Sequence, residues 1–503
     1  MIKTLQQAPF LRLSLFYIAG IVFGSLTDVP ASGWLGILLF SLLLILFSFF
    51  CRSYPFRWLF GAGCLVFFFS LGSLTLGKEN HKTDWTYDGW QEYDLEIVDA
   101  PVRKPKTWMC LSQTEGKKVI LYISADSLSA LLLPGDSLRI RANLQKPEAD
   151  YWRKKGIAAQ GFVPSGSWVK TGRRQSFDLF YQSLRVRHKL LELLRAIVPD
   201  NEMYITASAL LTGYTAGMTA ELRRTFAVTG TSHILAVSGL HFSSIYGAIY
   251  FLLSFLGKSR KSRIFRQLII LPFLWFFAFL TGLGPSVIRA VIMLSLWGIG
   301  DAFFFRTFTL NTLGVAALFM LLLNPLYLFD VGFQLSFSAV FSILTLNPYV
   351  VVLYQSRNPL LKSIWEMCSI SFSAQVGTLP FCLYYFHQFP LIFLLTNLFA
   401  IPLSNVLLFL MPFSLGINQL FPDLNLFNLI LNKALHLFLS GLRSMESVPY
   451  ALIEQLNFSL WDSILMGFYL LFFILFLIKK RVFYFCLGIL FVSIQVFHYF
   501  CLS

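Results

Sequence analysis

Polar side chains that could take part in chemistry are concentrated in one otherwise apolar stretch, from Ser208 to Arg263. Its ionisable and hydroxyl groups that stand out are Glu221, Arg223, Arg224, His233, Ser238 and His241. An ionisable group inside a membrane span costs roughly 2.5 to 3.5 kcal/mol on insertion scales, so such groups are functional candidates by default. A polar segment broken by glycine is tolerated at membrane depth where it is buried in protein or lines a wet cavity. The stretch is therefore predicted to line a passage for a polar solute, and then to continue as a long apolar helix.

Two other interpretations of the same residues remain open. His233 and His241 are eight positions apart, about 80° around a helix, so a Ser238–histidine nucleophile is conceivable. The segment AVSGLH lacks the GxSxG elbow of serine hydrolases, however, and no acidic partner follows nearby. Alternatively, the histidines simply hydrogen-bond neighbouring helices.

Further polar residues interrupt the apolar segments that follow; they are Arg289, Asp330, Gln334, Gln375 and Asn397. The guanidinium of Arg289 could contact passing phosphates, pair with Asp330 or snorkel to the membrane surface. Asp330 is expected to cap a helix. The three amides either bond neighbouring helices or line a passage.

The composition requires membrane helices to position these groups. Of 503 residues, 56% are hydrophobic and only 13% are charged, and repeated apolar runs predict a polytopic α-helical membrane protein with about 11 to 13 spans. Pro402 is expected to break the segment 391–415, and 426–442 has an amphipathic pattern, so a re-entrant arrangement is an alternative there. The net charge of +15 fits basic cytoplasmic loops and also a nucleic-acid path.

One soluble insert, residues 81–172, separates three N-terminal helices (1–80) from the rest. Segments 93–101, 117–124, 136–144 and 157–164 alternate as short strands, which suits a small β-barrel. Its basic and aromatic residues fit single-strand binding by charge and stacking; the candidates are Trp108, Arg139, Arg141, Tyr151 and Trp152. Acidic residues are nearly as numerous, so a barrel that acts only as a structural cap is equally compatible.

The insert is followed by a predicted interfacial segment, residues 173–200. Within it, residues 177–197 have the apolar spacing of an amphipathic helix. Arg185, Arg187, Lys189 and Arg195 are expected on its polar face, so a helix lying on membrane lipid is predicted. Residues 201–503 would form the transmembrane channel domain. Basic loops place the N-terminus in the cytoplasm and the barrel outside the membrane.

Cofactor chemistry has no sequence support. Gly72–Glu79 matches the glycines and lysine of a phosphate loop, but Glu79 stands where Ser or Thr should bind magnesium, and the segment ends a membrane helix. The seven cysteines are scattered without zinc spacing. Neither a cofactor nor a bound metal is expected, and any energy for transport must come from elsewhere.

Several linked segments resemble the ComEC family of competence proteins. The sharpest is ELRRTFAVTGTSHILAVSGLHF at 221–242; the others are GLGPSVIRAVIM at 282–293, DVGFQLSFSAV at 330–340 and SAQVGTLPFCLYYF with LTNLFAIPLSN between 373 and 405. PGDSLRIRANL and DYWRKKGIAAQGFV, at 134–144 and 150–163, resemble the family's OB-like domain.

This resemblance implies a bacterial inner-membrane channel, not an enzyme, that passes single-stranded DNA into the cytoplasm during natural transformation. It also implies a DNA-receptor protein outside and a helicase-like ATPase inside. Many relatives carry a metallo-β-lactamase-like domain, whose HxHxDH motif is missing from this sequence, so a separate nuclease is expected if one strand must be degraded. A transporter or flippase of another anionic solute is the alternative, and a catalytic role for Ser238 is a third.

Overall fold

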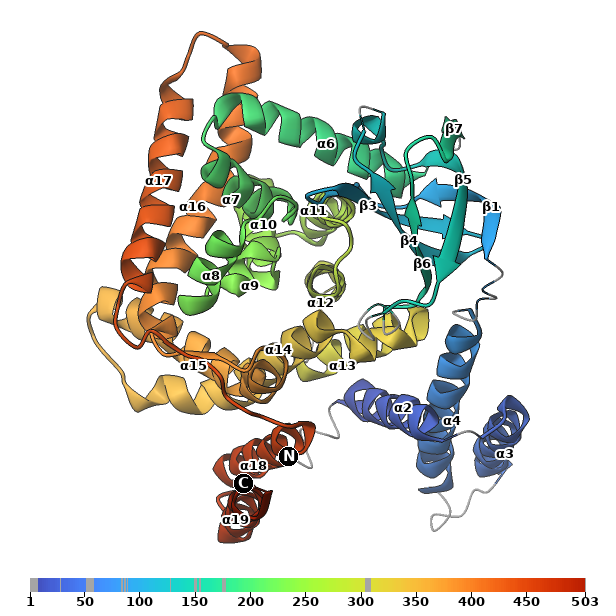
Figure 1. Ribbon diagram of the computed structural model, residues 1–503. Helices are drawn as coiled ribbons and strands as arrows, with labels where there is room; N and C mark the ends of the chain where they lie inside the picture. The colour runs from blue at the N-terminus through green and yellow to red at the C-terminus, as the bar shows by residue number, and fades with distance from the viewer. Residues whose placement is uncertain are drawn as a thin grey trace.

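The computed structural model describes residues 8–27, 29–50, 58–82, 85, 87, 89–126, 128–148, 152, 155–173, 178–303 and 309–502. It is a multi-pass helical membrane protein with a β-barrel insert (Figure 1), as predicted. Among the described residues, eight helices are long and apolar enough to span a membrane. They are α2 (Pro9–Leu26), α3 (Ala31–Phe50), α4 (Trp58–Lys82), α11 (Arg260–Leu280), α12 (Pro285–Phe303), α14 (Val331–Val350), α16 (Phe393–Leu420) and α18 (Leu460–Lys479).

Four further helices would bring that count to twelve if all of them cross. They are α13 (Thr309–Leu323), α15 (Pro359–Phe386), α17 (Leu426–Glu446) and α19 (Val482–Leu502). Whether these four helices cross stays a prediction, and so does the total of 11 to 13 spans.

The three N-terminal helices pack through small residues. A β-carbon on Gly20 of α2 would lie 1.9 Å from the Phe69 carbonyl oxygen, and one on Gly72 would lie 2.4 Å from the Tyr17 carbonyl oxygen. Glycine therefore lets the backbones of α2 and α4 touch, as small residues do in membrane helix pairs. Because α4 continues from Trp58 to Lys82 as one helix, residues 72–79 form no phosphate loop, which confirms their rejection.

The insert folds as a closed five-stranded barrel. Its strands are β1 (Trp90–Ile97), β3 (Thr107–Thr114), β4 (Lys117–Ser124), β5 (Asp136–Gln145) and β6 (Ile157–Val163). They pair in the order β1-β3-β4-β6-β5, and β1 also pairs with β5 to close the ring. Only β4 and β6 run parallel within this ring. The arrangement is consistent with the OB-like insert that was expected.

Three strands were not predicted: β3 of the barrel ring, and β2 and β7 at its edges. β3 was missed because Ser112 points inward while Leu111 is only half-buried, which hides the alternation of apolar residues. The edge strand β7 (Trp168–Arg173) pairs with β5, and the short β2 (Val102–Arg103) pairs with β3. Strand β1 ends at Ile97, earlier than the predicted boundary at 101.

Two contacts attach the barrel to the helices. Arg187 of α6 (Leu179–Ile197) donates a 2.8 Å hydrogen bond from Nη2 to Asp99 Oδ1, just beyond β1. On the other side, Lys155 Nζ lies 3.9 Å from Asp330 Oδ2. Helix α6 also packs on α11 and bridges the barrel and the helical part (Figure 1). The expectation that Arg187 lies on an exposed polar face was wrong: the residue is 6% exposed.

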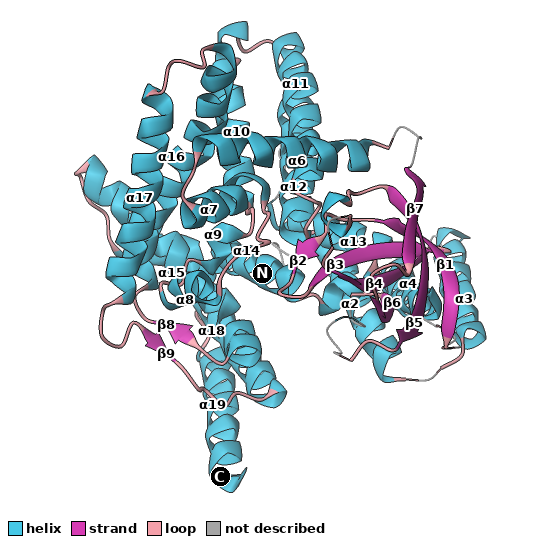
Figure 2. Cartoon of the chain, turned by 45° about the horizontal axis from the view of Figure 1, so that its top comes forward, coloured by secondary structure: helices cyan, strands magenta, loops and turns pink. Residues whose placement is uncertain are grey.

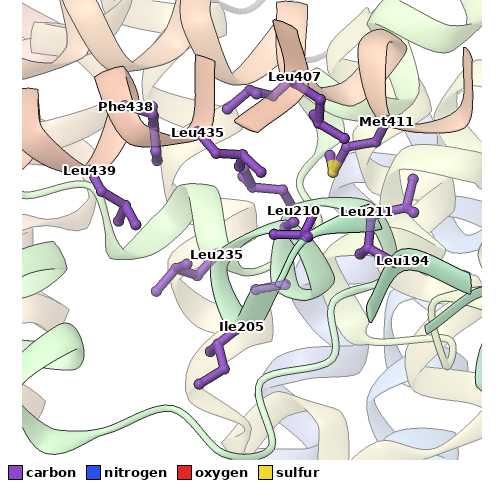
Figure 3. Packing of buried hydrophobic residues seen from close by; sticks show 14 of the residues in the cluster. Leu194, Ile205, Leu210, Leu211, Leu235, Leu407, Met411, Leu435, Phe438 and Leu439 are labelled. Atoms are coloured by element: carbon purple, nitrogen blue, oxygen red, sulfur yellow. The ribbon is translucent and has the colours of Figure 1, made fainter. Parts of the chain in front are cut away.

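Helices α16 and α17 pack on each other in the C-terminal part. Helix α16 runs through both Pro402 and Pro412 without a break, so the expectation that Pro402 ends a helix was wrong. Proline is tolerated in membrane helices because neighbouring groups satisfy the carbonyls that it frees. The apolar face of α17, with Leu435 and Phe438, packs on α7 (Asn201–Thr212) and α16, as Figure 3 shows.

Candidate functional site

The chain breaks its helical structure in the stretch that carries the ionisable residues. The stretch forms three helices, α8 (Ala220–Val228), α9 (Ser232–Leu235) and α10 (Gly239–Leu252), so the expected break by polar residues and glycine is present, but the apolar helix that follows has only 14 residues. Between α9 and α10, residues 236–238 are not helical. Their carbonyl at Val237 accepts a 3.0 Å hydrogen bond from Ser286 Oγ of α12. The break is thus fixed in place by the neighbouring helix.

His241 is the third residue of α10 and is 1% exposed. Its Nδ1 accepts a 3.1 Å hydrogen bond from the Ser238 backbone N–H, so the neutral ring carries its proton on Nε2. This Nε2 is buried without a hydrogen-bond partner among the described residues. Ser238 Oγ lies 3.3 Å from the same Nδ1, as in a helix cap. Among the described residues, no acidic side chain bonds His241, so none orients it for catalysis.

Arg289 lies beside this break. Its guanidinium contacts Gly239 so closely that an ideal β-carbon there would lie 3.1 Å from Nη2. Nη1 donates to the Ser336 carbonyl of α14, whereas Nε is buried with no partner. Arg289 is 7% exposed and forms no salt bridge with any residue that the structure describes. A buried cation without a counter-ion is costly, so this site is suited to receive an anion.

The remaining path candidates of α14 have structural partners. Asp330 caps the helix, since its Oδ1 accepts a 3.1 Å hydrogen bond from the Phe333 N–H, and it faces Lys155, not Arg289. Gln334 Nε2 donates to the Leu328 carbonyl at 2.9 Å, and its Oε1 accepts from Tyr385 at 3.0 Å. Asp330 thus caps α14 as expected, and Gln334 bonds neighbouring elements, which was one of the two expectations for it.

The two amides on the later helices differ from each other. Asn397 of α16 is 6% exposed, and its Oδ1 is buried without a partner in the described structure. Gln375 of α15 is half-buried. Asn397 therefore stays a candidate for lining the predicted path.

Arg223, Arg224 and His233 lie on exposed faces. Helix α8 turns Leu222 and Phe226 into the core and leaves both arginines outside. His233 lies on α9 and His241 on α10, so the two histidines do not share one helix face as the spacing suggested.

The predicted contacts of the barrel separate into two groups. Arg139 and Arg141 point outward from β5 opposite Asp94 and Glu92 of β1, and Arg139 Nε bonds Asp94 Oδ1 at 2.9 Å. This pairing holds the pKa of the Asp94 carboxyl below its usual range. Trp108 lies elsewhere, paired with Arg103 of β2. Trp152 is half-buried, and Tyr151 lies outside the described residues.

One functional residue was assigned to the wrong environment by the sequence. Arg187 bonds Asp99, lies with Cζ 5.6 Å from the Tyr214 ring centroid, and places Nη1 3.3 Å from a β-carbon built on Gly282. It therefore joins the barrel to the α7–α8 loop and the α11–α12 turn. Because other basic residues surround Arg187 in this helix, its burial could be recognised only in the three-dimensional structure.

These features define a polytopic membrane protein that carries an OB-like barrel and a helical domain with a broken, partly polar centre. The model of the family described as "Competence protein" matches residues 210–481, and the chain belongs to this family. The matched region includes α8 to α18, and so contains both the α9–α10 break and Arg289.

Three curated relatives share sequence with the chain. ComE operon protein 3 of Bacillus subtilis is 29% identical over 44% of this chain and 27% of its own length. An uncharacterized protein of Aquifex aeolicus is 32% identical over 63% of this chain and 77% of its own length. The uncharacterized protein YcaI of Escherichia coli is 22% identical over 49% of this chain and 33% of its own length. The match thus spans about a quarter of the Bacillus protein. No solved structure matches.

Proposed function

We propose that this protein is a channel of the bacterial inner membrane that passes single-stranded DNA into the cytoplasm during natural transformation. Membership of the competence family supports a role in DNA uptake. In this proposal the chain is a conduit, not an enzyme; an ATPase inside supplies the energy, and a receptor outside supplies the DNA.

The observation that carries the proposal is the buried guanidinium of Arg289, which has no carboxylate partner among the described residues. DNA presents one negative charge per nucleotide, and a buried arginine without a carboxylate offers each passing phosphate a counter-ion. His241 Nε2–H and Asn397 Oδ1 are the other buried polar atoms of this domain's predicted path without partners. Single sites of this kind favour brief contact over tight binding, as conduction requires.

The proposed orientation follows from the charges and the fold together. The basic residues between 258 and 266 lie just before α11 and in its first two turns, so this end is proposed to be cytoplasmic by the positive-inside rule. Helix α11 then ends at Leu280, next to Gly282, which contacts Arg187 and through it the barrel. The barrel therefore lies on the outer side, where incoming DNA arrives.

Uptake of labelled DNA into the cytoplasm of the native host tests the function. Wild type, a deletion strain and Arg289→Gln are compared, with Arg357→Gln as the control because it makes the same charge change at an exposed position. We expect the deletion strain to leave DNA outside. With both variants at normal membrane abundance, Arg289→Gln should also leave DNA outside, whereas Arg357→Gln should take it up. Uptake by the deletion strain would refute the DNA channel and favour another anionic solute.

A further inference from the structure

The barrel carries a basic turn that the predicted DNA contacts did not include as a unit. Between β2 and β3, the four residues Arg103, Lys104, Pro105 and Lys106 are all exposed. The Lys104 N–H donates a 2.8 Å hydrogen bond to the Thr107 carbonyl, which closes the turn. Arg103 pairs across the hairpin with Trp108, and its Cζ lies 6.0 Å from the Trp108 ring centroid. We call residues 103–106 the basic turn.

The three cations of the basic turn form no salt bridge with any residue that the structure describes, in contrast to Arg139 on β5, which Asp94 neutralises. In β1 and β5, acidic and basic residues face each other directly across the strands. The charges of the basic turn are therefore not offset by a carboxylate among the described residues, whereas Arg139 of β5 is neutralised by Asp94.

The basic turn also faces the helical domain. Figures 1 and 2 show the β2–β3 end of the barrel directed toward α11 and α12, not away from them. The same connection between β1 and β3 contains Asp99, which is bonded to Arg187. Arg187 in turn contacts Tyr214 and Gly282. The turn is thus anchored above the outer ends of the helices.

A series of contacts leads from that anchor to Arg289. The turn after α11 contacts the end of α7, because a β-carbon on Gly213 would lie 3.7 Å from the Thr281 carbonyl oxygen and 3.3 Å from Val237 Cγ2. Val237 belongs to the α9–α10 break, and two residues later Gly239 touches the Arg289 guanidinium. These contacts therefore place the exposed basic turn and the buried Arg289 at the same end of the helical domain.

We propose that the basic turn is the phosphate-binding element of the barrel, and that it holds single-stranded DNA at the helix ends above Arg289. This inference rests on the proposed function. The cations bind backbone phosphates without sequence preference, and Trp108 supports Arg103 by a cation–π contact and offers its ring edge to a base. Arg139 and Arg141 have no part in this binding.

The test measures binding of a fluorescent single-stranded oligonucleotide to the full chain in nanodiscs of neutral lipid, at several salt concentrations. The variant is Arg103→Gln/Lys104→Gln/Lys106→Gln. The matched control is Arg139→Gln/Arg141→Gln/Lys146→Gln, which removes the same charge from exposed positions of β5 and its end. Three lost phosphate contacts should reduce the slope of log affinity against log salt by about 2. We expect this change in the first variant and none in the control.

Folding of the barrel is checked by the protection of Cys110, which is fully buried in it. Equal slopes for the two variants with Cys110 protected would overturn the inference, as would a change in the control alone. DNA uptake by the native host would survive any of these results, so failure here is distinguishable from failure of the channel function.

Discussion

The Arg289 guanidinium lies against Gly239, with 3.1 Å between Nη2 and the position that a β-carbon would occupy. Such a contact is closer than ordinary van der Waals distance, so a side chain at 239 must displace the guanidinium. Glycine at this position therefore lets the arginine reach the first residue of α10 and the break that precedes it.

We expect Gly239→Val to abolish DNA uptake and Gly239→Ala to reduce it, because a branched side chain displaces Arg289 further than a single methyl group. Gly247→Val on the same helix is the control, since a β-carbon there meets nothing within 4 Å. Labelled-DNA uptake at matched membrane abundance is the measurement. Normal uptake by Gly239→Val would show that the position of Arg289 is unimportant.

The bond between Arg187 and Asp99 supports a second prediction, on stability. Arg187→Ala should destabilise the docking of the barrel by about 2 kcal/mol, the usual value of a hydrogen bond to a charged group. Lys189→Ala, at an exposed position of the same helix, should change stability by less than about 0.5 kcal/mol. Thermal unfolding and limited proteolysis near residue 173 would measure both. Equal behaviour of the two variants would contradict a structural role for the bond.

The sequence predicted helices well wherever apolar length decides the structure. Long apolar runs form helices, such as α2, α14 and α18, because a chain in a bilayer must satisfy its backbone hydrogen bonds internally. It failed at Pro402, where neighbouring helices permit a proline that would end an isolated helix.

The site was predicted by residue type but not by arrangement. Arg289 and His241 were identified because ionisable groups are rare in spans. Which of these groups lack partners depends on residues far apart in the chain, such as Ser336 for Arg289 and Tyr385 for Gln334. The face on which Arg187 lies was equally invisible, because its true partner Asp99 is 88 residues away.

Cys110 provides a third prediction, on pH and reactivity. Burial raises the pKa of its thiol from 9.0 to about 12. The folded barrel therefore keeps the thiol proton at pH values where the unfolded chain releases it, so the stability that the neutral thiol contributes is lost as the pH rises from 9 toward 12. Cys110→Val should weaken this loss.

Thiol labelling gives the direct measurement, because only the thiolate reacts. Cys110 should resist a water-soluble maleimide at pH 8, while Lys118→Cys, at an exposed position of β4, should react fully. Rapid labelling of Cys110 in the folded chain would contradict its burial.

The last prediction concerns whether α16 and α17 both cross the membrane. The short strands β8 (Phe389–Pro390) and β9 (Leu452–Ile453) pair with each other, with Phe389 opposite Ile453. Residues on the two sides of the α16–α17 pair must therefore lie at the same membrane surface, and the chain between them crosses twice or not at all. Helix α16 is predominantly apolar and its 28 residues exceed what a span requires, so two crossings are expected.

Cysteines introduced into a cysteine-free background would decide this. Asp423→Cys, between α16 and α17, should be labelled by an impermeant maleimide only after the membrane is opened. Tyr450→Cys lies beside β9 and is 88% exposed in the wild type, so it should be labelled in intact cells. Labelling of both positions from outside would mean that the pair is re-entrant, and the loop at 421–425 would then lie on the same surface as the barrel.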